Sequence, residues 1–200
     1  GSGREGVQFC AGSVPTIFSM HATKAFAIGE GGLIYSHDDE LVERMRRITN
    51  FGFDSSRSSV DVGINAKLSE ILAAVALTTL DQFEAKSIER KQLYELYETG
   101  LKQMPDWQLQ DLRGGTVAHQ FLSVLTPTAL GGSSVQARLL RLGVEARTYF
   151  NPACHQQRVF ADCPRGDLGV SESVASRVLS LPLWEGMTEK TVGRVLEALK

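Results

Sequence analysis

Apolar positions along the chain follow two spacings, which separate short strands from amphipathic helices. Two short β-type runs, over residues 16–20 and 33–36, lie on either side of a glycine-rich turn and predict a pair of strands. Between residues 40 and 48 apolar side chains recur at helical intervals with charges between them, which predicts an amphipathic helix. Asp38 and Asp39 are suited to cap this helix, because a carboxylate accepts the first unpaired backbone N–H groups.

The middle of the chain predicts a loop followed by two helices. Gly, Ser, Asn and Asp stand in irregular order over residues 50–66, which indicates a loop that is mobile or stabilised by a partner. An Ala- and Leu-rich helix is predicted over 69–80. It is apolar almost all round, so we expect it to be buried, against this chain or against another subunit. A long charged helix is expected to follow over 81–103 and to end before Pro105.

Beyond residue 104 the pattern becomes that of a smaller α/β unit. Strands are predicted over 116–126 and 144–149, and residues 181–183 are expected to be extended. Helices are predicted over 133–142, from a cap at Ser171 to residue 179, and from a cap at Thr188 to residue 199. The fold class is therefore α/β, and we expect two domains, residues 1–103 and 104–200.

Composition and charge narrow the class of protein. The chain has 200 residues, of which 42% are hydrophobic and 22% charged, as in ordinary globular proteins. Its net charge of -2, with scattered Lys and Arg, argues against a nucleic-acid partner. The longest uncharged apolar stretch, 71–80, is shorter than the roughly 20 residues of a membrane span. Cys10, Cys154 and Cys163 lack C-x-x-C spacing, so we expect no disulfide framework, no zinc site and a cytoplasmic location.

Lys24 differs from the other lysines in its surroundings. It follows a β-type stretch and precedes a glycine-rich turn, so its side chain is expected at the end of a strand, where ligand sites of sheets form. Ser19, five residues earlier, could donate a hydrogen bond to a phosphate while the amine reaches an aldehyde of the same cofactor. Taken alone, a lysine is usually a solvated surface charge, and Ser19 would be a strand-end hydroxyl bonded to backbone.

Several separated motifs match one family in the same order along the chain. They are Phe18-Ser19-Met20-His21-Ala22-Thr23-Lys24, Gly29-Glu30-Gly31-Gly32, Asn50-Phe51-Gly52, Gly63-Ile64-Asn65 with Ser69-Glu70, Arg90 before Tyr97, Arg147-x-Tyr149-x-x-Pro152-x-x-His155, and Leu179-Ser180-Leu181-Pro182-Leu183. From about Ala11 to the C-terminus the chain resembles the DegT/DnrJ/StrS-type pyridoxal-phosphate-dependent sugar aminotransferases. Chance would have to produce each motif independently.

The resemblance implies the aspartate aminotransferase fold, pyridoxal phosphate as cofactor, and nucleotide-linked keto sugars and an amino-acid donor as substrates. Lys24 would hold the cofactor as a Schiff base and then move a proton between substrate and cofactor carbons. Ser19 would bind the cofactor phosphate, and Asn65 would reach the phosphate of the neighbouring subunit's site in a homodimer or higher oligomer. Asn65 could instead be a turn residue that caps backbone. Lys67 departs from the family, whose members usually have arginine there.

Four further side chains are candidates for the substrate side of the pocket: His21, Arg147, Tyr149 and His155. Arg147 and His155 carry donors suited to a nucleotide-sugar phosphate or to the donor's carboxylate, although either could be a surface polar residue beside a strand. His21 could instead pack or hydrogen-bond under the cofactor loop. Glu30 is expected to shape the glycine turn rather than to take protons.

By the same resemblance the chain corresponds to roughly the C-terminal half of a subunit. The acidic partner of the pyridine nitrogen and the aromatic ring that stacks on the cofactor belong to the family's first half, and only 18 residues precede Ser19. We therefore expect 1–103 to be a remnant of the large domain with a long connecting helix, 104–200 to be the small domain, and transaminase activity to be low. The alternative is an inactive module that self-associates or binds a full-length partner through former interfaces. A third arrangement is a separate chain that supplies the missing half.

Overall fold

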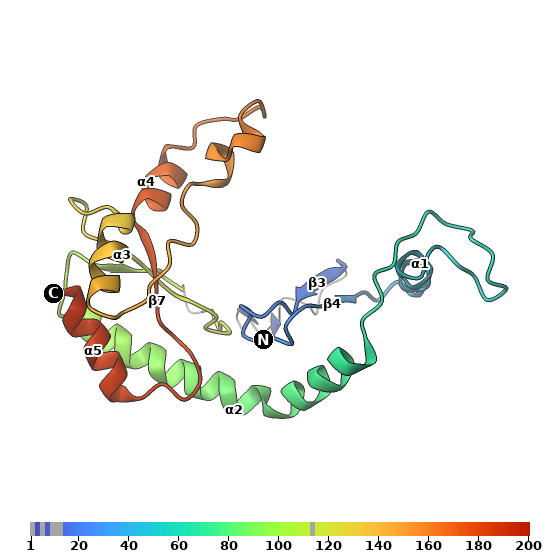
Figure 1. Cartoon of the computed structure of the whole chain (residues 1–200), viewed down its shortest axis with the longest axis horizontal. Coiled ribbons are helices and arrows are strands. Elements are labelled where there is room, and N and C mark those ends of the chain that lie inside the picture. Colours follow the sequence, from blue (N-terminus) through green and yellow to red (C-terminus); the bar gives the residue numbers. More distant parts are fainter. Residues whose placement is uncertain (1–2, 5–6, 9–13, 113–114) are drawn as a thin grey trace. The chain divides into compact units, whose positions relative to one another are not determined.

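The computed structural model describes residues 3–4, 7–8, 14–112 and 115–200. The chain divides into two compact units, of which unit 1 contains residues 1–85 and 114–118 and unit 2 contains residues 86–113 and 119–200. The longest helix, α2 (Glu70–Leu101), begins in unit 1 and ends in unit 2 (Figure 1). The division into domains after residue 103 stays a prediction.

In addition to the first part of α2, unit 1 contains two small antiparallel sheets and an amphipathic helix. Its other elements are β1 (Gly3–Arg4), β2 (Val7–Gln8), β3 (Thr16–Ser19), β4 (Gly32–Tyr35) and α1 (Asp39–Thr49). β1 pairs with β2, and β3 pairs with β4. α1 begins after Asp38, whose carboxylate accepts the Leu41 N–H at 3.0 Å. The strand pair, the helix and the cap that the sequence predicts here are confirmed.

The predicted loop over 50–66 is also confirmed, and two glycines allow its ends to meet. Gly52 has a φ of +76°, and a Cβ on it would lie 1.8 Å from the Asp61 carbonyl oxygen. A Cβ on Gly63 would lie 2.0 Å from the Gly52 nitrogen, so neither position has room for a side chain. The Asp61 carboxylate accepts from Arg47 Nε at 3.0 Å, and this hydrogen bond holds the pKa of Asp61 below its usual value.

Unit 1 leaves much apolar surface exposed. Among its described residues, only Met20 and Ile28 are buried apolar side chains. The first part of α2, which the sequence predicts to be buried, exposes 79% of Ile71 and 68% of Leu77. Within this chain that prediction is wrong, and burial against another subunit stays a prediction. The apolar pattern of a helix shows that it can be buried, but not which segment covers it.

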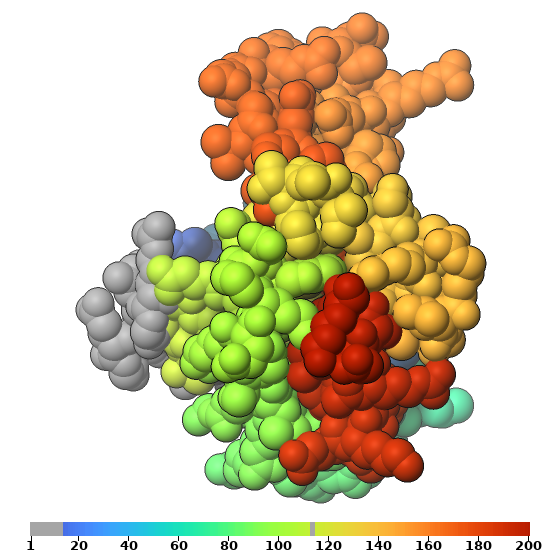
Figure 2. Space-filling view, turned by 90° about the vertical axis from the view of Figure 1, so that its left-hand side faces the viewer, coloured from blue at the N-terminus to red at the C-terminus, as the bar shows by residue number. Residues whose placement is uncertain are grey.

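Unit 2 packs three helices against a three-stranded antiparallel sheet. Its elements besides α2 are β5 (Gln108–Leu109), β6 (Leu122–Leu125), α3 (Gly132–Arg141), the 3-10 turns Cys154–Gln156 and Arg158–Phe160, α4 (Gly169–Arg177), β7 (Val178–Leu181) and α5 (Glu189–Leu199). β6 lies between β5 and β7. Figure 2 shows α5 (red) against the C-terminal part of α2 (green), where a Cβ on Gly100 would lie 2.3 Å from Leu196 Cδ1.

The core of unit 2 is formed by apolar side chains from the sheet and from α2, α3 and α5. Its fully buried members include Tyr97, Leu122, Leu139, Leu179 and Val192. Each buried side chain of this size contributes about 1.5–3 kcal/mol relative to its exposed state. The core therefore joins elements from both ends of unit 2's sequence and can hold this unit together.

Two predicted strands of unit 2 are largely absent. The strand over 116–126 is reduced to β6, because the carbonyls of His119 and Gln120 accept from Arg90 Nη1 at 3.1 and 3.3 Å and His119 has a φ of +42°. The strand over 144–149 is reduced to one bridge between Arg147 and Ser180. After this bridge the chain turns, since the Thr148 carbonyl accepts from Asn151 N–H at 2.7 Å, and no second ladder forms.

The helix predictions differ mainly at their ends. α3 is confirmed, and α5 is confirmed with its cap, since Thr188 Oγ1 accepts the Thr191 N–H at 3.2 Å. The two helices predicted over 69–103 are one helix, because no glycine or proline interrupts the chain near residue 80. α4 begins at Gly169 without a cap from Ser171 and ends at Arg177, because the next residues pair with β6 as β7.

Two further findings concern the class of protein. No helix in the described ranges is both long enough and apolar enough to cross a membrane. Cys154 and Cys163 are exposed free thiols, and Cys10 lies outside the residues that the structure describes.

Candidate active site

The candidate catalytic lysine lies in the turn that joins β3 to β4. We call residues 20–31 the lysine loop. Its base continues the strand pairing, with hydrogen bonds from Met20 N–H to the Gly31 carbonyl at 2.9 Å and from Ile28 N–H to the Met20 carbonyl at 3.0 Å. At the tip, Lys24 N–H donates to the His21 carbonyl at 2.9 Å. The backbone of Lys24 is therefore fixed by pairing on both sides of the loop.

Two apolar side chains of the lysine loop are buried and pack it against the rest of unit 1. They are Met20 and Ile28. A Cβ on Gly31 would lie 2.8 Å from Ile28 Cδ1 and 3.2 Å from Leu68 Cδ1, so the absent side chain at Gly31 leaves room for both. This packing gives the glycine-rich motif a structural reason and connects the loop to the segment just before α2.

Lys24 and Ser19 both keep reactive groups available. Lys24 is half-buried, and its Nζ forms no hydrogen bond or ion pair with any residue in the described part of the chain. Ser19 ends β3, is exposed, and its Oγ accepts the His21 N–H at 3.4 Å, which leaves the hydroxyl hydrogen free to donate. An amine and a hydroxyl donor thus come from the two ends of a short, backbone-bonded segment, and their joint role in cofactor binding stays a prediction.

His21 contacts other residues of the lysine loop through both ring nitrogens. Nδ1 accepts the Thr23 N–H at 3.2 Å and lies 3.0 Å from Thr23 Oγ1, while Nε2 lies 3.5 Å from Glu30 Oε1. The ring is 45% exposed. These contacts match the option that His21 hydrogen-bonds within the cofactor loop. Thr23 and Glu30, which provide the contacts, carry no predicted site role, and only their spacing of two and nine residues from His21 could have indicated them.

Asn65 lies where the two ends of the loop at 50–65 meet. It pairs with Asn50 in an isolated bridge, and the Phe51 N–H donates to the Ile64 carbonyl at 3.1 Å, so two separated motifs meet in space. Asn65 Oδ1 accepts from Lys67 Nζ at 2.8 Å, and Lys67 Nζ lies 4.2 Å from the centre of the Phe51 ring. This orientation leaves the Asn65 amide N–H groups free to donate, beside a positive charge.

Three predicted substrate residues belong to unit 2: Arg147 forms a bridge with Ser180 of β7, Tyr149 follows it, and His155 lies in the first 3-10 turn. Arg147 is exposed and its guanidinium pairs with Glu145. The Tyr149 ring packs on Phe121 with centroids 5.0 Å apart. His155 is 15% exposed, and its Nε2 lies 3.0 Å from Glu172 Oε1, a contact that requires the ring proton on Nε2. All three therefore have protein partners.

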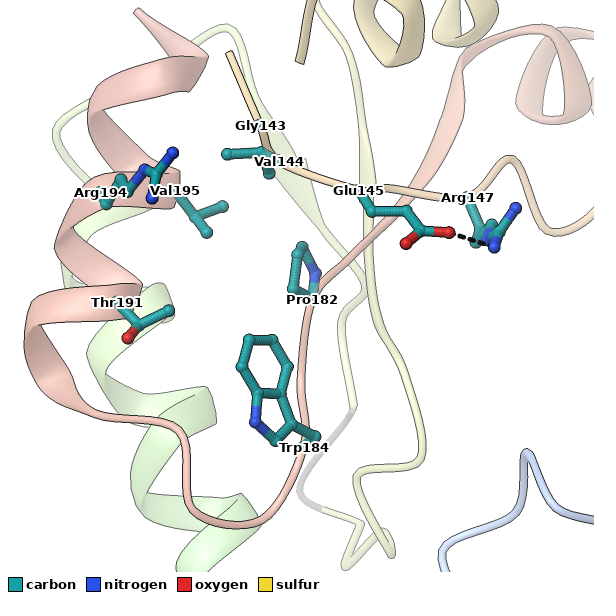
Figure 3. Close-up of a pocket in the computed structure, with 9 residues that line it drawn as sticks. All are labelled: Gly143, Val144, Glu145, Arg147, Pro182, Trp184, Thr191, Arg194 and Val195. Atoms are coloured by element: carbon teal, nitrogen blue, oxygen red, sulfur yellow. Dashed lines mark hydrogen bonds and ion pairs between the residues drawn. The ribbon is translucent and has the colours of Figure 1, made fainter. Parts of the chain in front are cut away.

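Unit 2 also has a surface pocket of about 380 Å³ between α5 and the segments around residues 145 and 183. Figure 3 shows Arg147 and Glu145 at one end of the pocket, Thr191 and Arg194 at the other, and the Trp184 ring between them. Of the predicted substrate residues, Arg147 lines this pocket and Tyr149 and His155 do not. Lys24, whose chemistry defines the candidate site, belongs to unit 1.

Other family-like motifs form a polar cluster that supports unit 2. Arg90, 11% exposed, donates through Nε to Glu185 at 2.7 Å as well as to the carbonyls of His119 and Gln120. Burial raises the pKa of Glu185, but the hydrogen bond and charge of Arg90, together with a backbone hydrogen bond and the charge of Lys86, outweigh it and hold the pKa below its usual value. The His119 ring packs on Tyr94, and burial lowers its pKa. These hydrogen bonds hold the backbone just before β6, so the role of this cluster is structural.

The fold and the lysine loop together define the class, that of the pyridoxal-phosphate-dependent aminotransferases. A candidate aminotransferase of this class from Bacillus cereus has a crystal structure with a TM-score of 0.92 and 39% sequence identity; the match covers 100% of this chain and 55% of that one. DesI, crystallised in the presence of its TDP-sugar product, has a TM-score of 0.86 and 35% identity over 92% of this chain and 48% of its own.

The family follows from the sequence. The model of the DegT/DnrJ/EryC1/StrS aminotransferase family matches residues 1–200, and the chain belongs to this family. Protein Rv3402c of Mycobacterium tuberculosis is 37% identical over 189 residues, which cover 92% of this chain and 45% of that protein. The chain spans about half the length of the curated relatives that it matches. The resemblance read from the motifs is confirmed, and the inactive interaction module finds no support here.

Proposed function

We propose that this chain carries the lysine-bearing part of a pyridoxal-phosphate-dependent aminotransferase whose substrates are nucleotide-linked keto sugars and an amino-acid donor. The observation that carries the proposal is Lys24 Nζ, an amine without a partner among the described residues, on a backbone-bonded loop that begins directly after Ser19. Membership of the sugar aminotransferase family gives this amine its chemistry. The GDP-perosamine synthase of Caulobacter vibrioides, 29% identical over 91% of this chain and 50% of its own length, supports the sugar class.

The donor set fits the cofactor. Pyridoxal phosphate supplies an aldehyde that an amine can attack and a ring that accepts electrons from the substrate carbon. Lys24 provides the amine, Ser19 a hydroxyl donor, and Asn65 an amide donor with Lys67 beside it. Hydroxyl, amide and ammonium groups all suit a phosphate, which only accepts hydrogen bonds.

Each residue then has a distinct role. Lys24 Nζ would hold the cofactor and, once freed by the amino donor, would act as the base that moves a proton from the substrate carbon. Ser19 Oγ would donate to the phosphate of the same site. Asn65 acts on the phosphate of a second copy of the chain in a homodimer, the arrangement that the family resemblance implies. Arg147, Tyr149 and His155 are the proposed contacts to the sugar nucleotide or to the donor's carboxylate.

Absorbance titration with pyridoxal phosphate tests the proposal. Addition of the cofactor to the chain is expected to produce the absorbance band of lysine-bound cofactor, and Lys24→Ala should abolish it. Lys91→Ala is the matched control, because Lys91 is exposed and pairs with Glu95 on α2. A band that survives in Lys24→Ala with undiminished amplitude would show that other lysines react and would refute the proposed role of Lys24.

A further inference from the structure

The turn that carries Lys24 is organised around the imidazole of His21. Four interactions meet at this residue: its N–H donates to Ser19 Oγ, its carbonyl accepts from Lys24 N–H, Nδ1 accepts from Thr23, and Nε2 faces Glu30. The two residues proposed to touch the cofactor, Ser19 and Lys24, are thus connected through the backbone of His21. The side chain of the same residue fixes the turn between them.

The contacts determine where the ring proton lies. A backbone N–H can only donate, so the Thr23 N–H at 3.2 Å requires a lone pair on His21 Nδ1. In the neutral ring the proton is then on Nε2, which faces Glu30 Oε1 at 3.5 Å, an acceptor when ionised. In this form both nitrogens have suitable partners. The opposite tautomer could still donate to Thr23 Oγ1 at 3.0 Å, but it would leave the Thr23 N–H without its acceptor and two acceptors facing each other at Glu30.

We propose that His21, as the neutral Nε2–H tautomer, is a positioning residue that holds the lysine loop in the shape from which Lys24 reaches the cofactor. The inference deepens the proposed function of Lys24 and depends on it. It assigns His21 to the protein's own loop rather than to the substrate.

The ring acts as one acceptor. Without it the Thr23 N–H loses its hydrogen bond at the start of the turn, and the next bond along the chain is the one from Lys24 N–H to the His21 carbonyl. Glu30 is the one acidic side chain within ion-pair distance of the ring among the described residues, and because it is 80% exposed, water screens this attraction. The Thr23 hydroxyl also contacts the ring at Nδ1, and the Ser19 hydroxyl accepts from the His21 backbone N–H.

Nuclear magnetic resonance tests the tautomer and the turn without cofactor. In the isolated chain near neutral pH, the His21 ring nitrogens are expected to show Nε2 protonated and Nδ1 bare, and the Thr23 amide should be protected from exchange. His21→Ala should speed Thr23 exchange roughly threefold to tenfold, the range for loss of one hydrogen bond. His21→Asn, whose carbonyl oxygen can take the place of Nδ1, should restore protection, whereas His21→Gln should not. A ring protonated at Nδ1, or equal Thr23 exchange in all four proteins, would overturn the inference.

The rate at which Lys24 reacts with pyridoxal phosphate tests the consequence. His21→Ala should slow the reaction by about threefold to tenfold and His21→Asn should restore most of it. If the parent chain modifies Lys24 and His21→Ala reacts equally fast, the positioning role fails while the proposed function stands. If pyridoxal phosphate never modifies Lys24 in the parent chain, the proposed function and the positioning role both fail. The exchange rate of the Thr23 amide then still decides whether the ring holds the turn.

Discussion

Replacement of Tyr97 by phenylalanine removes one hydrogen bond from the core of unit 2 and keeps the ring. Tyr97 is fully buried on α2, and its hydroxyl donates to the Pro182 carbonyl at 2.9 Å, just after β7. A lost hydrogen bond costs about 0.5–1.5 kcal/mol, and a buried acceptor left without a donor adds to this. Since Pro182 is only half-buried, water can reach its carbonyl in part, and we expect a total loss of about 1–2 kcal/mol of unfolding free energy.

Urea unfolding followed by tryptophan fluorescence measures this loss. With a urea dependence of about 2 kcal/mol/M, the midpoint of unit 2 should fall by roughly 0.5–1 M in Tyr97→Phe. Tyr94→Phe is the matched control: Tyr94 is half-buried on the same helix, and its hydroxyl bonds to no residue in the described ranges. Equal midpoints for Tyr97→Phe and the parent chain, or an equal drop in both variants, would refute the reasoning that this hydroxyl joins α2 to the end of β7.

Two further predictions concern an ion pair and a loop. The folded pKa of Glu185 lies below its ordinary value of 4.5, so its bond to Arg90 stabilises unit 2 above that pH and is lost as the pH falls through the lower folded value. Between about pH 7 and about pH 3 the urea midpoint should therefore drop less in Glu185→Gln than in the parent chain. Gly52→Ala should open the loop at 50–65 and speed amide exchange at Val60, whose N–H donates to the Gly52 carbonyl. Gly29→Ala, at a φ of +96° but in open space, should cost only the left-handed backbone, about 1–2 kcal/mol in its own turn, and leave Val60 unchanged.

The helices and the lysine loop are the parts that the sequence predicts well. Asp38 and Thr188 cap helices where their side chains accept backbone N–H groups, because capping depends on a few neighbouring residues. Ser19 ends β3 and Lys24 lies in the turn that follows, with only four residues between them. Local chemistry within one turn of chain is sufficient for both results.

Features that depend on distant partners are predicted less well. The strand over 116–126 is shortened because Arg90, from a helix about 30 residues earlier, takes the carbonyls of His119 and Gln120. Glu172 is 17 residues from His155 and could not be identified as its partner from spacing. Apolar periodicity in the first part of α2 indicates that the helix can be covered, and it carries no information on the covering segment. Long-range pairing is what a single sequence specifies least directly.

Chemical trapping of the cofactor tests the central claim most directly. The chain is incubated with pyridoxal phosphate, reduced with borohydride so that any lysine-bound cofactor becomes permanent, digested and mapped by peptide mass. The account predicts that Lys24 carries most of the label at limiting cofactor, with Lys91 and the other exposed lysines labelled only at excess. Label spread over the surface lysines, with Lys24 no more reactive than Lys91, would contradict it.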